Sequence, residues 1–274
     1  MHNWFIFSIL GLVEGLTEFL PISSSGHLIV ARELLGATGG NSLAIDAVLQ
    51  CGTILAVVVY FFKDLLNLAY TALRRVMGRP VRAEDERLLI ALIIGTVPAV
   101  ILGLFLEKTM DTVFRNTHLV AYALILGSLV FLCAEYISKQ NRMHQGVEKV
   151  GIIKAFVIGL FQTVALVPGM SRSGMTISGG LFLGLSREAA ARFGFLLSVP
   201  VIAGAGAKKL FELKGTGELA VLGAPLLLGA LVAFVSGLLA IHFLLKFLRT
   251  HPLYVFAVYR ILLALLILVF LPAF

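Results

Sequence analysis

Long apolar runs separated by short polar segments cover most of the chain. A helix that crosses a membrane needs about 20 apolar residues. Six runs have about this length, and we predict a transmembrane helix in each: residues 43–62, 88–106, 119–137, 189–207, 219–245 and 253–271.

Two further apolar stretches, residues 4–35 and 152–185, are interrupted near the middle by Pro, Gly and Ser. The interruptions read LPISSSGH and VPGMSRSGMT. Proline removes a backbone donor and restricts the preceding residue, so a helix should end at each interruption. Such irregular backbone is tolerated at membrane depth only inside protein or beside a watery cavity. We therefore predict two re-entrant helical hairpins. The alternative is two kinked helices that each cross once, which gives eight crossings.

The two halves of the chain resemble each other. GLVEGLTEFLPISSSG, from Gly11, aligns with GLFQTVALVPGMSRSG, from Gly159, with a one-residue slip. A hairpin and three spans follow one another in residues 1–140 and again in residues 150–274, within one membrane domain. Three is odd, so the second copy should be inverted, and broken helices of such repeats meet near the midplane. The predicted fold is an all-α polytopic membrane protein with six transmembrane helices and two re-entrant hairpins in an inverted-topology repeat.

Composition and charge agree with a membrane protein and orient it. The chain is 59% hydrophobic and 14% charged, which is too apolar for a soluble domain. Basic residues concentrate in the expected loops 63–87, 139–154, 187–192 and 246–251, which we place in the cytoplasm. Both termini and the first hairpin then open outward. The net charge of +7 indicates orientation and anionic lipid rather than nucleic acid. Arg260, inside the last run, is expected to reach the cytoplasmic interface.

The first interruption follows two acidic residues in an apolar run. Glu14 and Glu18 are four residues apart, so they share one helix face. Each ionised carboxylate costs about 2.5 to 3.5 kcal/mol in such a segment. A divalent cation, an arginine or a proton must offset this cost. Oxygen ligands suit Mg²⁺ or Ca²⁺, so we predict a metal site at these glutamates. The alternative is a protonated pair bonded to backbone.

The polar residues of the first interruption are Ser23, Ser24, Ser25, Gly26 and His27. One serine is expected to cap the helix that follows. Amides at a helix start bind phosphate, and glycine allows backbone to approach a ligand closely. The histidine suits a general base, a general acid or a nucleophile. Its alternative role is that of a packing residue.

The second interruption supplies a cation. Arg172 lies between Ser171 and Ser173, and Thr176 follows one turn later. A guanidinium in a re-entrant loop is expensive unless it meets an anion, and its planar fork suits phosphate. The alternative is a structural ion pair with one of the glutamates of the first interruption. Acids in one half and an arginine in the other predict one composite site for an anion and a metal.

These two motifs together resemble the signatures of the bacterial undecaprenyl-diphosphate phosphatase family, also known as the bacitracin-resistance proteins. EGLTEFLPISSSGH is similar to the family's acidic motif, and PGMSRSGMT to its second motif. The resemblance covers the whole chain and implies hydrolysis of undecaprenyl diphosphate in the bacterial inner membrane, which recycles the carrier of peptidoglycan synthesis. It implies that Glu14 and Glu18 are the metal-associated carboxylates, Ser23 and Ser24 the motif serines, His27 the motif histidine and Arg172 the phosphate-binding arginine, with Ser171, Ser173 and Thr176 lining the second loop. We predict catalytic roles for Glu14, Glu18, Ser24, His27 and Arg172, with Ser24, His27 or a water activated by His27 as the attacking group. Phosphate binding is predicted for Ser23, Ser25, Gly26, Ser171, Ser173 and Thr176.

A secondary transporter or flippase of an anionic lipid is the alternative function. Inverted repeats with broken helices are typical of transporters, and buried Arg and Glu could form a substrate and proton site. The type 2 phosphatidic acid phosphatases are excluded, because they need a further histidine downstream and none lies between His144 and His242. The expected partners are a polyprenyl diphosphate and membrane lipids. The sequence also allows a homodimer.

Overall fold

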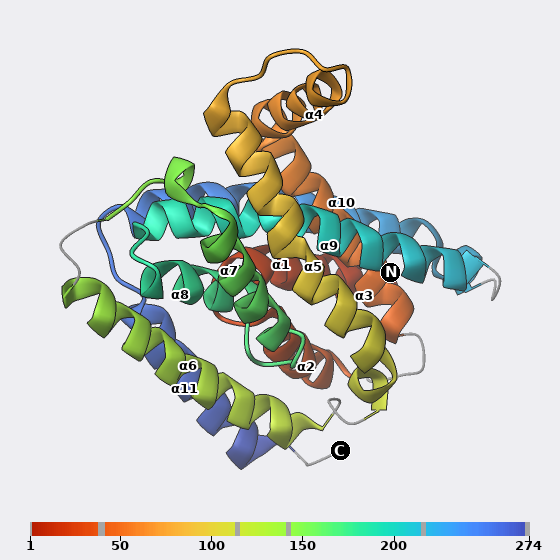
Figure 1. Ribbon diagram of the computed structural model, residues 1–274. Coiled ribbons are helices and arrows are strands. Elements are labelled where there is room, and N and C mark those ends of the chain that lie inside the picture. Colours follow the sequence, from red (N-terminus) through yellow and green to blue (C-terminus); the bar gives the residue numbers. More distant parts are fainter. Residues whose placement is uncertain (1, 38–41, 113–115, 141–143, 215–217, 272–274) are drawn as a thin grey trace.

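The computed structural model describes residues 2–37, 42–112, 116–140, 144–214 and 218–271. Within these residues the chain is helical apart from turns and one isolated bridge between Gln145 and Leu185. The helices, shown in Figure 1, are α1 (His2–Phe19), α2 (Ser24–Leu35), α3 (Ser42–Tyr60), α4 (Phe62–Val76), α5 (Ala83–Thr112), α6 (Thr117–Gln140), η1 (Val147–Lys149), α7 (Ile152–Val164), α8 (Arg172–Phe182), α9 (Arg187–Lys214), α10 (Glu218–Leu248) and α11 (Tyr254–Phe270).

The prediction of an all-α polytopic membrane protein is confirmed. Among the described residues, α5, α6, α9 and α10 contain segments long and apolar enough to cross a membrane. The bent pair of α3 and α4 adds a fifth candidate if it is counted as one span. Helix α11 is apolar but has only 17 residues. Both interruptions end a helix, after Phe19 and after Val164, as the proline rule predicts.

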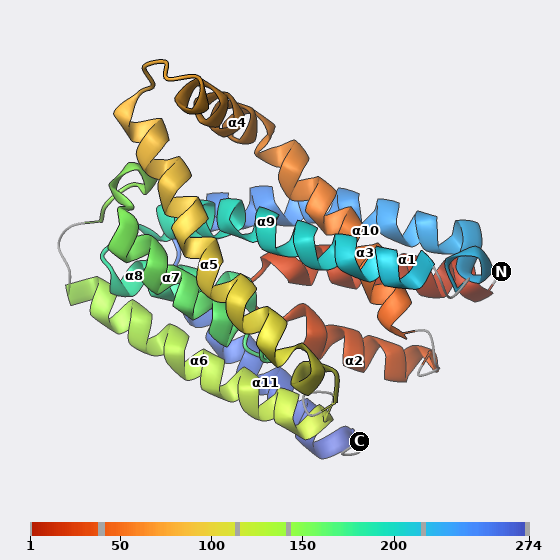
Figure 2. The same cartoon turned by 45° about the vertical axis from the view of Figure 1, so that its right-hand side comes forward.

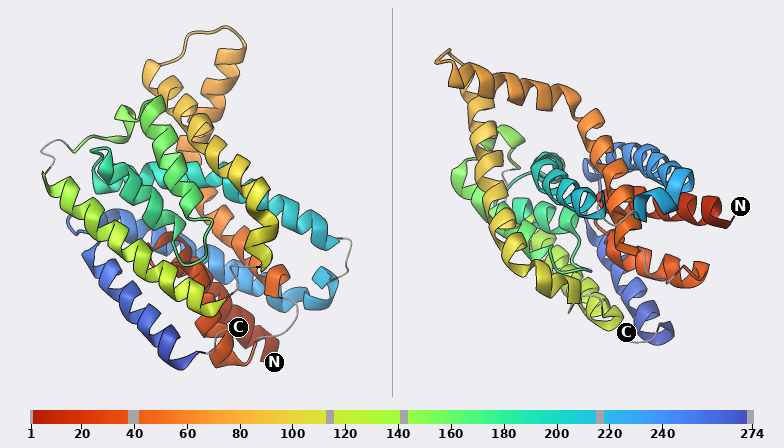
Figure 3. Two further views of the ribbon diagram at one scale, coloured as in Figure 1. Left: turned by 60° about the horizontal axis from the view of Figure 1, so that its bottom comes forward. Right: turned by 90° about the vertical axis from the view of Figure 1, so that its right-hand side faces the viewer.

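The prediction of a loop at residues 63–87 is wrong. This segment contains α4 and the first turn of α5, and α4 is bent by 76° from α3 at the break around Phe61. The charged residues of α4 occur at helical spacing and leave an apolar stripe between them. Helix α4 connects the ends of α3 and α5 outside the packed body (Figures 2 and 3).

The arms of the two hairpins make equivalent contacts with the long helices. Helix α1 packs on α10, and α7 packs on α5 (Figure 1). Gly11 of α1 touches the backbone of Gly229, and Gly159 of α7 touches the backbone of Gly95. A Cβ at either position would overlap the facing carbonyl oxygen. Close backbone approach at small residues is how helices associate in a membrane. The same contact therefore recurs at aligned positions of the two halves.

Replacing Gly159 with Ala should destabilise the protein by about 1 to 3 kcal/mol, because the new methyl group meets backbone that cannot rotate away. Thermal unfolding in detergent measures this effect. Gly103→Ala is the matched control, since it lies in a helix with no atom within 4 Å of its added Cβ. The control should leave Tm unchanged or raise it slightly. Equal Tm values for the two variants would contradict the close contact.

Candidate active site

Both helix breaks are built in the same way. Ser23 precedes α2 with φ of 75°, and Ser171 precedes α8 with φ of 70°. Each serine hydroxyl accepts a hydrogen bond from a glycine amide three residues later, Gly26 N at 3.4 Å and Gly174 N at 3.3 Å. The prediction that one serine of the first break is an N-cap is confirmed for Ser23. A positive φ in a non-glycine residue is uncommon and persists only where the surroundings enforce it.

The two breaks are hydrogen-bonded to each other. The Ser25 hydroxyl of the first break accepts from the Gly169 amide of the second at 3.1 Å. In return, the Ser173 hydroxyl of the second break donates to the Leu20 carbonyl of the first at 3.1 Å. Ser25 and Ser173 occupy aligned positions, so the contact is reciprocal. The structure thus brings together the two segments that the composite site requires.

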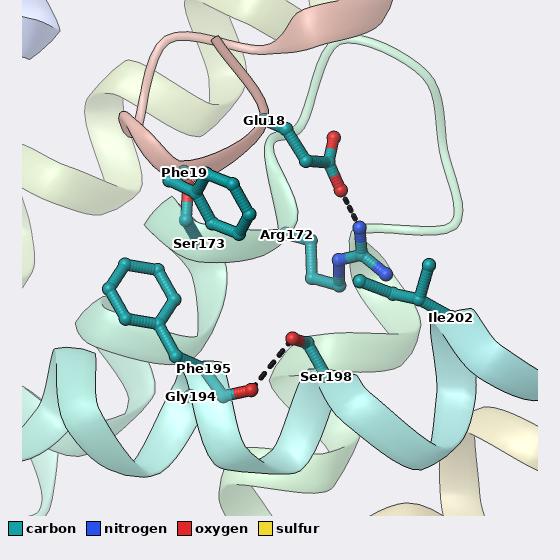
Figure 4. Close-up of a pocket in the computed structure, with 8 residues that line it drawn as sticks. All are labelled: Glu18, Phe19, Arg172, Ser173, Gly194, Phe195, Ser198 and Ile202. Atoms are coloured by element: carbon teal, nitrogen blue, oxygen red, sulfur yellow. Dashed lines mark hydrogen bonds and ion pairs between the residues drawn. The ribbon is translucent and has the colours of Figure 1, made fainter. Parts of the chain in front are cut away.

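Glu18 joins the first residues of α2 and α8. The Ser24 hydroxyl donates to Glu18 Oε2 at 2.7 Å, and Arg172 forms an ion pair with Glu18 Oε1. The Glu18 side chain is 7% exposed and that of Arg172 is 20% exposed. Figure 4 shows the carboxylate and the guanidinium pointing toward each other. Of the two glutamates considered for this ion pair, the structure selects Glu18.

Glu14 lies one turn before Glu18 and is buried, with 4% of its surface exposed. It interacts electrostatically with Asp46, Arg172 and Arg32, and Arg32 forms an ion pair with Asp46. Its Oε2 atom is buried and has no hydrogen-bond partner in the described part of the chain. An orphaned carboxylate oxygen of this kind fits a cation ligand. No group of three or more His, Cys, Asp or Glu able to hold a metal occurs among the described residues, so other ligands would come from substrate or water.

A small, partly open pocket lies beside the Glu18–Arg172 pair. Its walls come from α1, α8 and α9 (Figure 4), and the lining residues are Glu18, Phe19, Arg172, Ser173, Gly194, Phe195, Ser198 and Ile202. Ser198, which was not predicted, donates to the Phe195 carbonyl at 2.8 Å. Its signal was a hydroxyl in an apolar run two residues before Pro200.

His27 lies on α2, one turn after Ser24, and contacts α11 rather than the ion pair. Its Nδ1 is 2.7 Å from the Ser23 carbonyl and its Nε2 is 2.7 Å from the Tyr259 hydroxyl. The two rings are stacked, with centroids 5.5 Å apart. No hydrogen bond joins His27 to Ser24 or Arg172 among the described residues. Tyr259 was not predicted, because its partner is more than 200 residues away.

The remaining predicted residues hold the loops together. Thr176 directs its hydroxyl to the carbonyls of Arg172 and Ser173, at 3.0 and 3.1 Å. The Ser171 hydroxyl accepts a hydrogen bond from the Gly174 amide as the helix cap and is also hydrogen-bonded to the Ser173 hydroxyl. Gly26 packs near Leu124. In this structure these groups shape the site without pointing a free donor into the pocket.

The expectation that Arg260 reaches the interface is wrong. Its side chain is completely buried and donates to the Ser128 hydroxyl and to the carbonyls of Leu124, Gly169 and Met170, at 2.9 to 3.2 Å. Its guanidinium also lies 4.7 Å from the centre of the Phe131 ring. Backbone carbonyls therefore take the place of water around the charge. Arg260 holds the backbone two residues before Arg172.

Arg260→Met should lower the free energy of unfolding by about 2 to 5 kcal/mol, because buried carbonyls lose their donors. Tm in detergent is the measurement. Ser128→Ala removes one of the four bonds and should cost only about 1 kcal/mol. If both variants lower Tm by the same small amount, Arg260 does not anchor the second break.

Comparisons with known proteins show the family of this chain. The family model described as "Bacitracin resistance protein BacA" matches residues 7–266. The undecaprenyl-diphosphatase of Chloroherpeton thalassium is 42% identical over 269 residues, which cover 95% of this chain and 94% of that protein. The undecaprenyl-diphosphatase of Mycobacterium tuberculosis H37Rv is 44% identical over 266 residues, 95% of this chain and 92% of that protein.

Proposed function

This chain belongs to the bacitracin resistance protein family, and we propose that its two helix breaks form the active site of an undecaprenyl-diphosphatase. The protein is a multi-pass membrane phosphatase that hydrolyses undecaprenyl diphosphate to undecaprenyl phosphate and inorganic phosphate. The observation that carries the assignment of the site is the convergence of Ser24 and Arg172, from different breaks, on Glu18.

Arg172 and the helix starts bind the diphosphate in this proposal. Phosphate oxygens compete with Glu18 for the guanidinium, whose planar fork can hold two of them at once. The first amides of α2 and α8 add donors at the positive ends of two helices. Ser25 and Ser173 keep the two breaks in register through their reciprocal bonds. Phosphoryl transfer depends mainly on such positioning and charge neutralisation.

Ser24 makes the attack and Glu18 takes its proton. The 2.7 Å bond from the hydroxyl to the carboxylate supports this choice over His27, whose ring nitrogens are both engaged elsewhere. A bond forms between Ser24 Oγ and the terminal phosphorus, and the bridging P–O bond breaks. Undecaprenyl phosphate leaves with the bridging oxygen. Water then attacks the phosphoserine, releases inorganic phosphate and restores Ser24, which regains a proton through Glu18.

His27 has a positioning role. It follows Ser24 by one turn of α2, and Tyr259 fixes its ring through a hydrogen bond and a stacking contact. A ring held this way presents a fixed edge beside the helix start where the phosphate binds. The alternatives are that His27 is the nucleophile or that it acts as the base for a direct attack by water. Trapping of the phosphorylated residue by acid quenching distinguishes them from attack by Ser24.

Glu14 and Glu18 would hold a divalent cation, Mg²⁺ or Ca²⁺. The unpartnered Oε2 of buried Glu14 supports this assignment. Bound there, the cation would neutralise charge on the diphosphate oxygens.

Removing the divalent cation with a chelator should abolish turnover, and Mg²⁺ or Ca²⁺ should restore it. Glu14→Gln should raise the metal concentration required for half-maximal activity by about 10-fold or more, because one charged ligand is lost. Glu84→Gln, an exposed change at the start of α5, is the control. Metal-independent turnover of both proteins would contradict the metal assignment.

The finer membrane arrangement is also part of the proposal. Residues 1–140 and 150–274 form two inverted repeats, each with a re-entrant hairpin and three spans, in the bacterial inner membrane. Both termini lie on the outer side. The matching serine caps and the matching glycine contacts support the repeat. The undecaprenyl chain lies among the apolar spans beside the site.

Phosphate release in detergent tests the function. Purified protein should release inorganic phosphate from undecaprenyl diphosphate in detergent. Hydrolysis needs no second compartment, whereas transport does. A transporter or flippase of anionic lipids, the alternative function, would bind the lipid without releasing phosphate. Binding without turnover at saturating Mg²⁺ and Ca²⁺ would therefore overturn the phosphatase assignment.

A further inference from the structure

Helix α4 carries five large apolar residues on the side that faces away from the protein. Phe62, Leu66, Tyr70, Leu73 and Val76 are each more than half exposed. Their spacing of four, four, three and three residues places them on one face of a helix. We call these five residues the apolar arc. An exposed patch of this kind marks a surface that something apolar covers.

Three polar residues of α4 contact the protein on the opposite side. Asn67 donates to Asp85 of α5 at 2.8 Å, and Asp64 accepts from Arg192 of α9 at 2.5 Å. Thr71 is buried on the same side. Leu68 is buried there as well, so the protein side of α4 mixes polar and apolar contacts while its outer side is apolar. Contact of the apolar arc with water would be unfavourable.

Geometry and charge identify what covers the arc. Helix α4 is bent by 76° from α3, so it runs nearly parallel to the membrane plane if α3 crosses the membrane. Lys63 and Arg74 follow Phe62 and Leu73 directly and border the arc on one side. Neither of them forms an ion pair within the described residues. Basic residues beside an apolar face are typical of helices that lie on anionic bilayers.

We propose that α4 is an interfacial helix that seats its apolar arc in the acyl chains of an anionic leaflet. Lys63 and Arg74 meet lipid phosphate groups at the same depth. The pair of Asp64 with Arg192 connects this helix to α9, which lines the active-site pocket. The proposal rests on α4 alone and does not depend on the phosphatase activity.

Tryptophan quenching by brominated lipids measures the depth of α4 in the whole protein. Trp4 is the only tryptophan, so Trp4→Phe provides a silent background. Leu66→Trp and Tyr70→Trp report on the apolar arc, and Arg79→Trp, in the exposed turn after α4, is the matched control. Leu262→Trp, on an exposed apolar position of α11, reports on a span. The vesicles contain phosphatidylcholine with or without phosphatidylglycerol, brominated either near the headgroup or near the chain end.

Both arc positions should lose fluorescence most with bromine near the headgroup, while position 79 loses little and position 262 loses most with deep bromine. Lys63→Gln with Arg74→Gln should remove the additional quenching that phosphatidylglycerol gives at position 66. Quenching at position 66 no greater than at position 79 would overturn the proposal, because water or another copy would then cover the arc. Strongest quenching by deep bromine would also overturn it, since α4 would then be part of a span.

Discussion

Arg172→Ala is expected to lower kcat/KM by about 1,000-fold or more, the range seen for arginines that neutralise a transferring phosphoryl group. Arg172 is the guanidinium that reaches Glu18 across the two breaks, and no other described arginine lines the pocket. The variant also leaves Glu18 without its ion-pair partner. Steady-state phosphate release from undecaprenyl diphosphate, at saturating metal, measures the loss.

Two further arginine variants separate charge from geometry. Arg172→Lys keeps the charge but loses the planar fork, so it should recover only part of the activity. Arg249→Ala is the matched control, because Arg249 forms an exposed pair with Glu188 that is remote from the pocket. The control should keep full turnover. If Arg172→Ala also kept it, Arg172 would be only a structural partner of Glu18.

Ser24→Ala is expected to reduce turnover by about 10,000-fold or more, as loss of a nucleophile does when residual catalysis comes from binding alone. The hydroxyl donates to a buried carboxylate, so removing it takes away both the attacking oxygen and its link to Glu18. Rapid acid quenching with substrate labelled in the terminal phosphate should trap a phosphoserine in the native enzyme and none in the variant.

Ser8→Ala serves as the control, because the Ser8 hydroxyl only donates to the Trp4 carbonyl of its own helix. Its turnover and its trapped label should match those of the native enzyme. Label recovered on His27 would make the histidine the nucleophile. Full turnover by Ser24→Ala, with no trapped label in either protein, would indicate direct attack by water.

The features that could be predicted from the sequence are local ones. Pro21 and Pro168 mark where the two helices must end, and a serine before a helix is a common cap. Buried charge of both signs also predicts that acid and arginine meet. The choice of Glu18 over Glu14 could not be read from the sequence, because both face the same way on α1.

The features that were missed depend on distant parts of the chain. Arg260 is buried because four acceptors from α6 and the second break surround it, and Gly127 leaves room for its guanidinium. Nothing near Arg260 in the sequence signals this. The partner of His27 is Tyr259 and the partner of Asp64 in α4 is Arg192, and both partners lie more than a hundred residues away in the sequence. Helix α4 was not predicted, because its segment carries charges of both signs among its apolar residues.

A double-mutant cycle on Glu18 and Arg172 tests most directly whether the two breaks form one catalytic centre. Residues that act as one unit lose activity together, so a second change costs little once the first is made. We expect Glu18→Gln, Arg172→Ala and the double variant to have the same kcat/KM within about 10-fold. Losses that multiply in the double variant would show that the two residues act independently, and would contradict a shared site.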